Sequence, residues 1–315
     1  MGLLITAALL LCAVILIAFF ASRKALRRPP SLDFRDDEVL MHSEWFAYRD
    51  IIRPAVDWVY AQNWETLSMQ SADGLTLRGL WLPQKGATTA LILMHGYGSL
   101  PQNDGAVSAR WAAQKGYSVF LPWQRGYGES GGNYTALGRL EAEDCRRWAQ
   151  KIRELMGPDC KLILGGVSMG SATVFHALDK TSGGTPMPEN VRAVVCDCGY
   201  TSVKDILRHV VKNYLHLRSF PLLQLCCLFF RLYNGIWPGK TDAVEYLKET
   251  ELPIFFSHGK ADRLVPYEMT ERAYEACASP KHLFTCENAG HGASALVERE
   301  RYYAELEKFL APYLK

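Results

Sequence analysis

Apolar and polar residues alternate along most of this chain in a pattern that predicts an α/β fold. Short apolar runs bounded by turn residues are typical of buried strands, and longer segments with apolar residues every three or four positions are typical of helices packed on one side. The runs expected to form strands are 89–94, 117–121, 161–165, 191–196, 253–257 and 282–286. The segments expected to form helices are 103–115, 137–156, 168–180, 267–279 and 294–313.

Ahead of this alternation, two strand-like runs at 66–71 and 75–82 surround Asp73-Gly74, which predicts an opening β-hairpin. A hairpin followed by alternating strands and helices predicts a mostly parallel sheet with helices on both faces. Residues 65–198 and 252–315 are therefore expected to form the core of one α/β domain.

The alternation is interrupted by residues 199–251, a segment much longer than a simple crossover requires. Its first part, 205–216, is basic and amphipathic, and its second part, 220–237, is almost wholly apolar. We expect a helical cap over the carboxyl edge of the sheet, where open α/β sheets bind their ligands. Its role has three alternatives: a lid packed on the core, the wall of an acyl-binding pocket, or a second contact with a membrane.

The first residues form a different kind of segment. No charged residue occurs from 2 to 21, and this run is long enough to cross a bilayer as a helix. An uncleaved anchor is favoured over a signal peptide, because no basic region precedes the run and 18–20 lacks small residues at both cleavage positions. The positive-inside rule then places the body of a single-pass protein in the cytoplasm. The basic residues that follow the run are Arg23, Lys24, Arg27 and Arg28.

Residues 1–28 are thus expected to be a membrane anchor with its basic flank. Residues 29–64 are expected to be a linker, because Pro29-Pro30 ends the helix. The linker carries many aromatic residues among charged ones. This composition fits either a helical lead-in packed on the body or a segment that lies at the membrane interface.

Composition excludes several classes of function. A net charge of +2 over 315 residues gives no electrostatic basis for binding nucleic acid. The 9 cysteines include no C-x-x-C pair and are odd in number, which argues against a disulfide framework and fits a reducing compartment. The spacing typical of metal ligands is also lacking, so we expect no metal and no cofactor.

The chemistry is indicated by Ser168, which lies in the sequence GVSMG at 166–170. A strand-like run precedes this serine and a helical pattern follows it, which predicts a nucleophile elbow, the turn that exposes a serine hydroxyl. A second match, GESGG at 128–132, has loop-like sequence on both sides, and no helix starts at Ser130. We therefore expect Ser168 to be the nucleophile and Ser130 to be a chance match.

A serine nucleophile needs a base, and the base must be oriented by a carboxylate. After an elbow, the acid and then the histidine follow in chain order. Asp262 lies in the loop after the strand 253–257, and His291 lies in a glycine-bounded loop after 282–286. Both candidates thus belong to the sheet edge that carries Ser168.

The oxyanion of an acyl-transfer intermediate needs two backbone N–H donors. We expect them from Met169, which follows the nucleophile, and from Tyr97 in the glycine-rich turn HGYG at 95–98. Asp197 is the rival acid, because it also ends a strand. His95 and His258 each precede a glycine at a strand end and are expected to be structural, since neither follows the required order.

These motifs resemble those of the α/β-hydrolase superfamily over residues 66–315. One departure from the family pattern is Trp123: relatives often have an aspartate at this position, which is usually structural. The family also includes enzymes with an aspartate nucleophile, and Ser168 argues against those branches of the family. The matching blocks are HGYG (95–98), RGYGES (125–130), GVSMG (166–170), the Asp262 loop and NAGHG (288–292). Further blocks similar to those of bacterial hydrolases with an N-terminal anchor are Leu137-Gly138 with Glu141, Asp144 and Trp148, and DCGYTS (197–202).

The residues and the resemblance together predict a serine hydrolase that cleaves a carboxylic ester through an acyl-enzyme. Its substrate is expected to be a small molecule with a lipophilic or medium-chain acyl group. One alternative is a peptidase of the same fold, in which Asp242, Glu245 and Glu249 would bind a charged end of the substrate. The others are acyl transfer to an acceptor other than water, and a membrane-anchored binding protein without catalysis.

Overall fold

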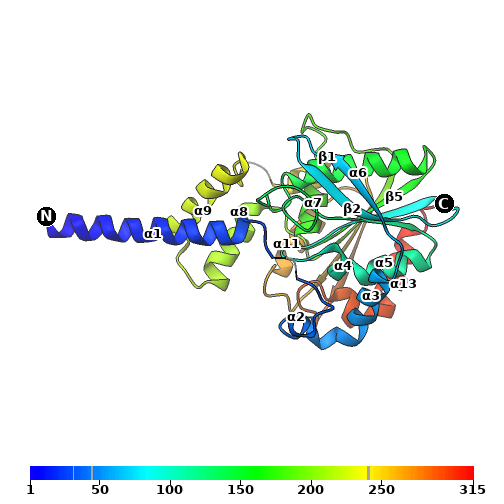
Figure 1. Ribbon diagram of the computed structural model, residues 1–315, viewed down its shortest axis with the longest axis horizontal. Helices are drawn as coiled ribbons and strands as arrows, with labels where there is room; N and C mark the ends of the chain where they lie inside the picture. Colours follow the sequence, from blue (N-terminus) through cyan, green and yellow to red (C-terminus); the bar gives the residue numbers. More distant parts are fainter. Residues whose placement is uncertain (31, 44, 240–241) are drawn as a thin grey trace.

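The computed structural model describes residues 1–30, 32–43, 45–239 and 242–315. At its centre is an eight-stranded sheet with the order β1-β2-β4-β3-β5-β6-β7-β8 (Figure 1). The β1–β2 and β2–β4 pairs are antiparallel and all the other pairs are parallel, so the predicted hairpin and mostly parallel sheet are confirmed. The strands are Glu65–Gln70 (β1), Thr76–Leu82 (β2), Thr89–Met94 (β3), Ser118–Pro122 (β4), Lys161–Val167 (β5), Val191–Asp197 (β6), Ile254–Gly259 (β7) and Lys281–Cys286 (β8).

Helices cover both faces of the sheet. Successive strand residues point to opposite faces, and both sets are apolar, so each face needs a layer of helices to bury it. In β3, Leu91 and Leu93 belong to one apolar core, whereas Ala90, Ile92 and Met94 belong to the other. The first core is closed by Arg49–Tyr60 (α3), Ala106–Gln114 (α5), Ser294–Val297 (α12) and Arg299–Leu310 (α13), and the short helix Pro101–Asp104 (α4) contacts α3 and α5. The second is closed by Glu141–Met156 (α6), Met169–Ala177 (α7), Val244–Glu249 (α10) and Tyr267–Ala276 (α11).

One predicted helix begins later than its sequence pattern indicates. The pattern starts at 137, but α6 starts at Glu141, because Leu137 and Gly138 have φ values of 51° and 95° that no α-helix contains. The fully buried carboxylate of Glu141 stabilises this turn by accepting hydrogen bonds from the amides of Ala136 (2.8 Å) and Gly138 (3.0 Å). Two other predicted helices are each divided into two: 103–115 corresponds to α4 and α5, and 294–313 corresponds to α12 and α13.

The linker is largely ordered against the body. It contains the helix Asp37–Met41 (α2), a 3₁₀ turn at Phe46–Tyr48 and α3. Ile52, Val56 and Val59 of α3 are buried in the first core. The helical lead-in therefore packs on the body, as one of the two alternatives for this segment predicts.

The helix Gly2–Leu26 (α1) projects from the body (Figure 1). In the described part of the chain, it alone is long and apolar enough to cross a membrane. The segment after β6 forms Val203–His209 (α8), a π-helical turn at Val210–Tyr214 and Ser219–Asn234 (α9). α9 lies beside α1, where the ring of Phe229 contacts that of Phe19 with 5.6 Å between centroids.

The base of α1 is held by the loop that contains Ser130. The carbonyl of Leu26 accepts a hydrogen bond from the Thr135 amide, and the Arg28 amide donates to the carbonyl of Asn133, both at 2.8 Å. The Arg28 guanidinium also donates to the carbonyl of Ser130 at 2.9 Å. The projecting helix is thus joined to the body by backbone pairing.

A buried ion pair joins the hairpin to α6. The guanidinium of Arg125 makes two hydrogen bonds to the carboxylate of Asp144, at 2.7 and 2.8 Å, and two to the half-exposed carboxylate of Asp73. Burial raises the pKa of Asp144 to about 6, although Arg125 opposes that shift. The carboxylate of Asp144 therefore depends on Arg125 for its charge near neutral pH.

We expect Arg125→Met to lower the free energy of unfolding by about 3–5 kcal/mol at pH 8, because it leaves a buried carboxylate unpaired. The loss should shrink at pH 5, since Asp144 is then protonated and no charge stays buried. Urea titration of the full chain in detergent measures both values. Asp73→Asn is the matched control and should cost less than about 1 kcal/mol, because that pair is solvent-exposed on one side. An equal loss from both substitutions would contradict this account.

Candidate active site

Ser168 occupies a sharp turn between β5 and α7. Its backbone has φ 55° and ψ −114°, and its amide donates to the carbonyl of Asp197 at 2.9 Å. Two glycines make the turn possible: a Cβ on Gly166 would lie 2.4 Å from the carbonyl carbon of Gly170, and one on Gly170 would lie 2.0 Å from the carbonyl oxygen of Met94. The strand, turn and helix expected around Ser168 are therefore present, with the left-handed backbone that such a turn requires.

Asp262 and His291 meet at the same edge of the sheet. His291 Nδ1 donates to Asp262 Oδ2 at 2.7 Å, and Asp262 Oδ1 accepts the amides of Leu264 and Val265 at 2.9 Å each. Burial alone would raise the pKa of Asp262, but hydrogen bonds from His258 and His291 hold it well below its usual range. An ionised Asp262 keeps the proton of a neutral His291 on Nδ1, which makes Nε2 the acceptor.

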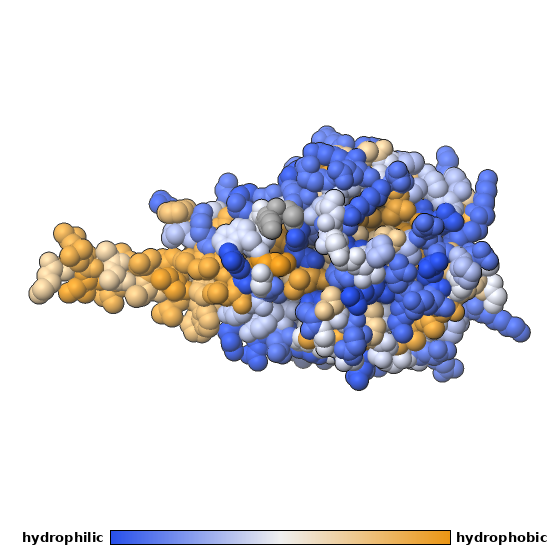
Figure 2. Space-filling model, turned by 90° about the horizontal axis from the view of Figure 1, so that it is seen from above, coloured by the Kyte–Doolittle hydropathy of each residue, from blue (hydrophilic) through white to orange (hydrophobic). Residues whose placement is uncertain are grey.

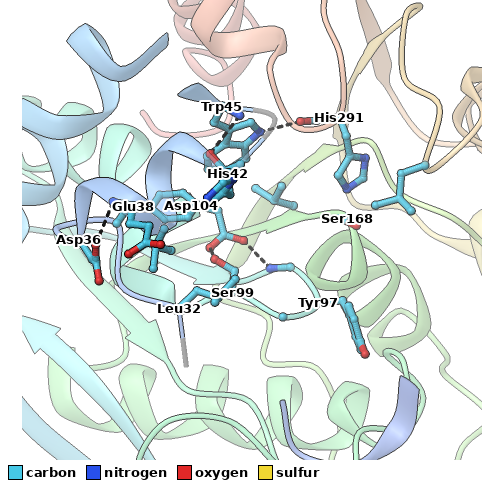
Figure 3. Close-up of a pocket in the computed structure, with 17 residues that line it drawn as sticks. Leu32, Asp36, Glu38, His42, Trp45, Tyr97, Ser99, Asp104, Ser168 and His291 are labelled. Carbon is cyan, nitrogen blue, oxygen red and sulfur yellow. Dashed lines mark hydrogen bonds between the residues drawn. The ribbon is translucent and has the colours of Figure 1, made fainter. Parts of the chain in front are cut away.

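Ser168 and His291 line one pocket of about 580 Å³, in which both are labelled in Figure 3. The opposite wall comes from the linker, through residues between 32 and 45, and from the turn after β3. None of the described residues of 199–251 lines it. The alternative in which the cap forms the wall of an acyl pocket is therefore wrong for this pocket, because the linker occupies that position.

Trp45 connects the linker to the histidine loop. Its indole Nε1 donates to the carbonyl of His291 at 2.8 Å (Figure 3). Its ring packs on Gly292, where a Cβ would lie 2.9 Å from the indole. The sequence pattern does not indicate this role. Trp45 is one of several aromatic residues in the linker, and nothing in the local pattern indicates a contact with a loop near the other end of the chain.

The two residues expected to bind an oxyanion both belong to the surroundings of Ser168: Tyr97 lines the pocket, and Met169 follows the serine and is buried. Met169 starts α7, where the first amides of a helix have no partner within the helix. The neighbouring amides of the β3 turn are already bound: that of Gly96 to Asp104 Oδ2 at 2.7 Å, and that of Gly98 to the hydroxyl of Tyr127 at 3.4 Å. Tyr97 therefore stays the predicted oxyanion donor of this turn.

The rival acid, Asp197, lies deeper in the core. Its Oδ1 accepts hydrogen bonds from the hydroxyls of Ser257 (2.9 Å) and Ser294 (3.1 Å), and burial raises its pKa. Asp262, in contrast, is bonded directly to His291. The geometry therefore favours Asp262 as the residue that orients His291.

The two histidines expected to be structural are both buried. The Nδ1 of His95 donates to the carbonyl of Gly96 at 2.8 Å and its Nε2 accepts the Gln124 amide at 3.1 Å, so both nitrogens are used, and burial lowers its pKa. The Nε2 of His258 donates to Asp262 Oδ2 at 3.1 Å and to the carbonyl of Val265 at 2.9 Å. His258 thus helps to hold the carboxylate that binds His291, a role that the sequence pattern did not indicate.

The second serine motif has a structural environment. Ser130 is buried, and its hydroxyl donates to the carbonyl of Trp123 at 2.6 Å and accepts the Arg78 amide at 2.8 Å. The ring of Trp123 packs on Gly128, where a Cβ would lie 2.1 Å from it. Ser130 therefore holds β2 against the loop below α1, and its hydroxyl is not exposed to a pocket.

Three described side chains lie close enough together in space to be tested as metal ligands, although they are far apart in the sequence. The ligand atoms of Cys198, Asp262 and His291 all lie within 4.8 Å of one another. The residues fit a metal poorly, because Asp262 and His291 are hydrogen-bonded to each other and burial raises the pKa of the Cys198 thiol well above its ordinary value. A thiol kept protonated is a weak ligand.

Comparisons with known proteins agree with this architecture. The family model described as the alpha/beta hydrolase fold matches residues 89–223. The uncharacterized protein YqkD of Bacillus subtilis is 24% identical over 240 residues, which are 76% of this chain and 77% of that protein. The uncharacterized membrane protein YNL320W of Saccharomyces cerevisiae is 24% identical over 249 residues, which are 78% and 79% of the two chains. The solved esterase Pf2001 of Pyrococcus furiosus superposes with a TM-score of 0.67 at 19% identity, covering 92% of this chain and 99% of its own.

The turn at Ser168 predicts a difference between two glycines of the site. Gly166→Ala should lower the free energy of unfolding by about 2 kcal/mol or more, because its Cβ would meet backbone atoms that cannot move aside without shifting α7. Gly290→Ala is the matched control, since a Cβ there meets nothing within 4 Å, and should change stability by less than about 0.5 kcal/mol. Urea titration of both variants is the measurement. If Gly166→Ala were as stable as Gly290→Ala, the backbone geometry at Ser168 would be wrong.

Proposed function

Because the chain has the α/β-hydrolase fold, we propose that it is a serine hydrolase that cleaves a carboxylic ester in the pocket beside Ser168. One observation supports this proposal most: the 2.7 Å bond between His291 and Asp262 lies at the pocket that Ser168 also lines. The fold on its own indicates hydrolysis, and these three side chains indicate how it proceeds.

In the proposed acylation step, Ser168 Oγ attacks the carbonyl carbon of the ester while His291 Nε2 takes its proton. Asp262 stabilises the imidazolium that forms, and the amides of Tyr97 and Met169 bind the oxyanion. When the tetrahedral intermediate collapses, His291 gives the proton to the departing alkoxide, and an acyl ester of Ser168 remains. Water then repeats the sequence, with His291 again as the base, and releases the carboxylic acid.

The lining of the pocket supports a lipophilic acyl group. Most of the surface of the pocket is apolar, and its apolar side chains come from the linker, the turn after β3, the elbow and the loop after β7. They are Leu32, Phe34, Val39, Trp45, Tyr97, Val167 and Leu264. Leu32 follows the end of α1 at Leu26 by six residues, a distance of about 20 Å at most even for an extended chain. An anchored enzyme of this shape would hold its pocket near the headgroups of a bilayer, with the body expected on the cytoplasmic side.

A peptidase is the second candidate, and acidic side chains in the pocket are what favour it. The acidic residues first considered, Asp242, Glu245 and Glu249, do not line the pocket: Asp242 pairs with Arg272, and Glu245 pairs with Lys248 at 2.8 Å. Three other acidic residues line it: Asp104, whose Oδ2 accepts the Gly96 amide, and Asp36 and Glu38 of the linker, which lie on the side away from Ser168 (Figure 3). Asp36 and Glu38 would bind the amino group of a peptide substrate.

Hydrolysis of nitrophenyl esters tests the proposal. Ser168→Ala should lower kcat by a factor of about 10⁴ or more, because it removes the nucleophile, whereas Ser130→Ala should retain turnover per folded molecule. Activity and the folded fraction are measured on the same detergent-solubilised samples. Loss of turnover in folded Ser130→Ala, with activity retained in Ser168→Ala, would reverse the choice of nucleophile.

A substrate series separates the two candidates. We expect kcat/KM for nitrophenyl esters to rise with acyl length from acetyl to octanoyl, by roughly fourfold for each methylene group that becomes fully buried. Aminoacyl anilides should be cleaved at least 100-fold more slowly. Faster cleavage of the anilides, lost in Glu38→Gln, would favour the peptidase instead.

A further inference from the structure

Part of the apolar surface of the cap is exposed in the described part of the chain. α9 presents an exposed apolar stripe that begins at the kink residue Phe220, which is 76% exposed, and includes Leu232, which is 66% exposed. Leu228 lies one helical turn before Leu232 on the same face, and the exposed position one turn earlier is the polar Gln224. Soluble surfaces rarely gather large apolar side chains in this way. Further exposed apolar residues nearby are Leu215, Leu217 and Trp237.

This stripe belongs to a helix that is packed against the candidate membrane anchor. Ala18 of α1 is fully buried in a cluster with Leu222 and Cys226 of α9, and Phe229 contacts Phe19 edge to face. The contact lies in the last third of α1, not at its junction with the body. Figure 2 shows apolar surface along the projecting helix that continues onto its base.

The position of this contact along α1 sets its depth. The uncharged run that would fill the hydrocarbon core ends at Ala21, and an α-helix rises about 1.5 Å per residue. Ala18 is therefore about 5 Å inside the end of that run, which matches the depth at which interfacial helices lie in a bilayer. A bilayer around α1 would reach α9, because the two helices are in contact there.

Charge around the stripe fits the same partner. Between 203 and 239 the basic residues outnumber the single acidic residue, Asp205, which is paired with Arg208 and Arg272. Exposed basic side chains at the border of an apolar surface are typical of helices bound at anionic headgroups, and an exposed tryptophan is typical of that level as well. The basic residues are Lys204, Arg208, Lys212, Arg218 and Arg231.

We propose that α9 and the turn before it form a second membrane-contacting surface, which lies in the interface of an anionic bilayer beside α1. Such a surface would add to the anchor in two ways. It would fix the rotation of the body about the axis of α1, which a single spanning helix leaves free. It would also hold the linker-walled pocket at a constant height above the headgroups.

The test uses the full chain reconstituted into vesicles of phosphatidylcholine and phosphatidylglycerol that contain a trace of phosphatidylcholine with a diazirine in its acyl chain. After irradiation, protease digestion and mass spectrometry locate the labelled residues. We expect adducts in α1 and in 215–237. The exposed Leu155 of α6 is the internal control and should stay unlabelled, because it lies on the body.

A double variant, Phe220→Asp with Leu232→Asp, should lower labelling of the cap by tenfold or more while labelling of α1 is unchanged. Leu155→Asp should change neither, and a thermal melt checks that both variants fold. Adducts confined to α1 in the wild type would overturn the proposal, as would cap labelling that the double variant leaves unchanged. None of these readouts requires turnover, so they are independent of the proposed hydrolysis.

Discussion

The left-handed backbone of Ser168 is the constraint on which the rest of the site depends. With φ at 55°, the chain reverses within one residue, and α7 returns directly beside β5 and β3. This close return leaves no room for side chains at Gly166 and Gly170. It also places the serine at the carboxyl edge of the sheet, where the loops after β7 and β8 bring Asp262 and His291 together. With a negative φ at this residue, the side chain of Ser168 would point in another direction, away from Asp262 and His291.

The N-terminal segment has two structural roles. Its helix α1 is joined to the body by the loop around Ser130, and its linker returns across the sheet edge to wall the pocket and hold His291 through Trp45. Anchor, linker and pocket are thus consecutive parts of one chain segment. Movement of the anchor relative to the body would be transmitted first to the wall of the pocket, since only a few residues separate Leu26 from Leu32.

Much of this arrangement was predictable from sequence, because it rests on local patterns. Apolar runs gave the positions of the strands, and strand–turn–helix context separated Ser168 from Ser130. The role of Trp45 was not predictable, since it depends on a contact between residues 246 positions apart. The choice among the three alternatives for the cap was not predictable for the same reason: an apolar segment inserted after β6 has the composition of a binding surface, and only its packing shows that it lies against α1. The second hydrogen bond to Asp262, from His258, likewise follows from packing rather than pattern.

The most direct measurement is the location of a covalent adduct. The full chain is treated with a fluorophosphonate, which reacts with serines activated by a neighbouring base, and the modified residue is identified by mass spectrometry. The account predicts one adduct, on Ser168, that forms at least 100-fold more slowly in Asp262→Asn but at a nearly unchanged rate in Asp197→Asn. A folded wild-type protein that does not react, or an adduct on Ser130, would contradict it.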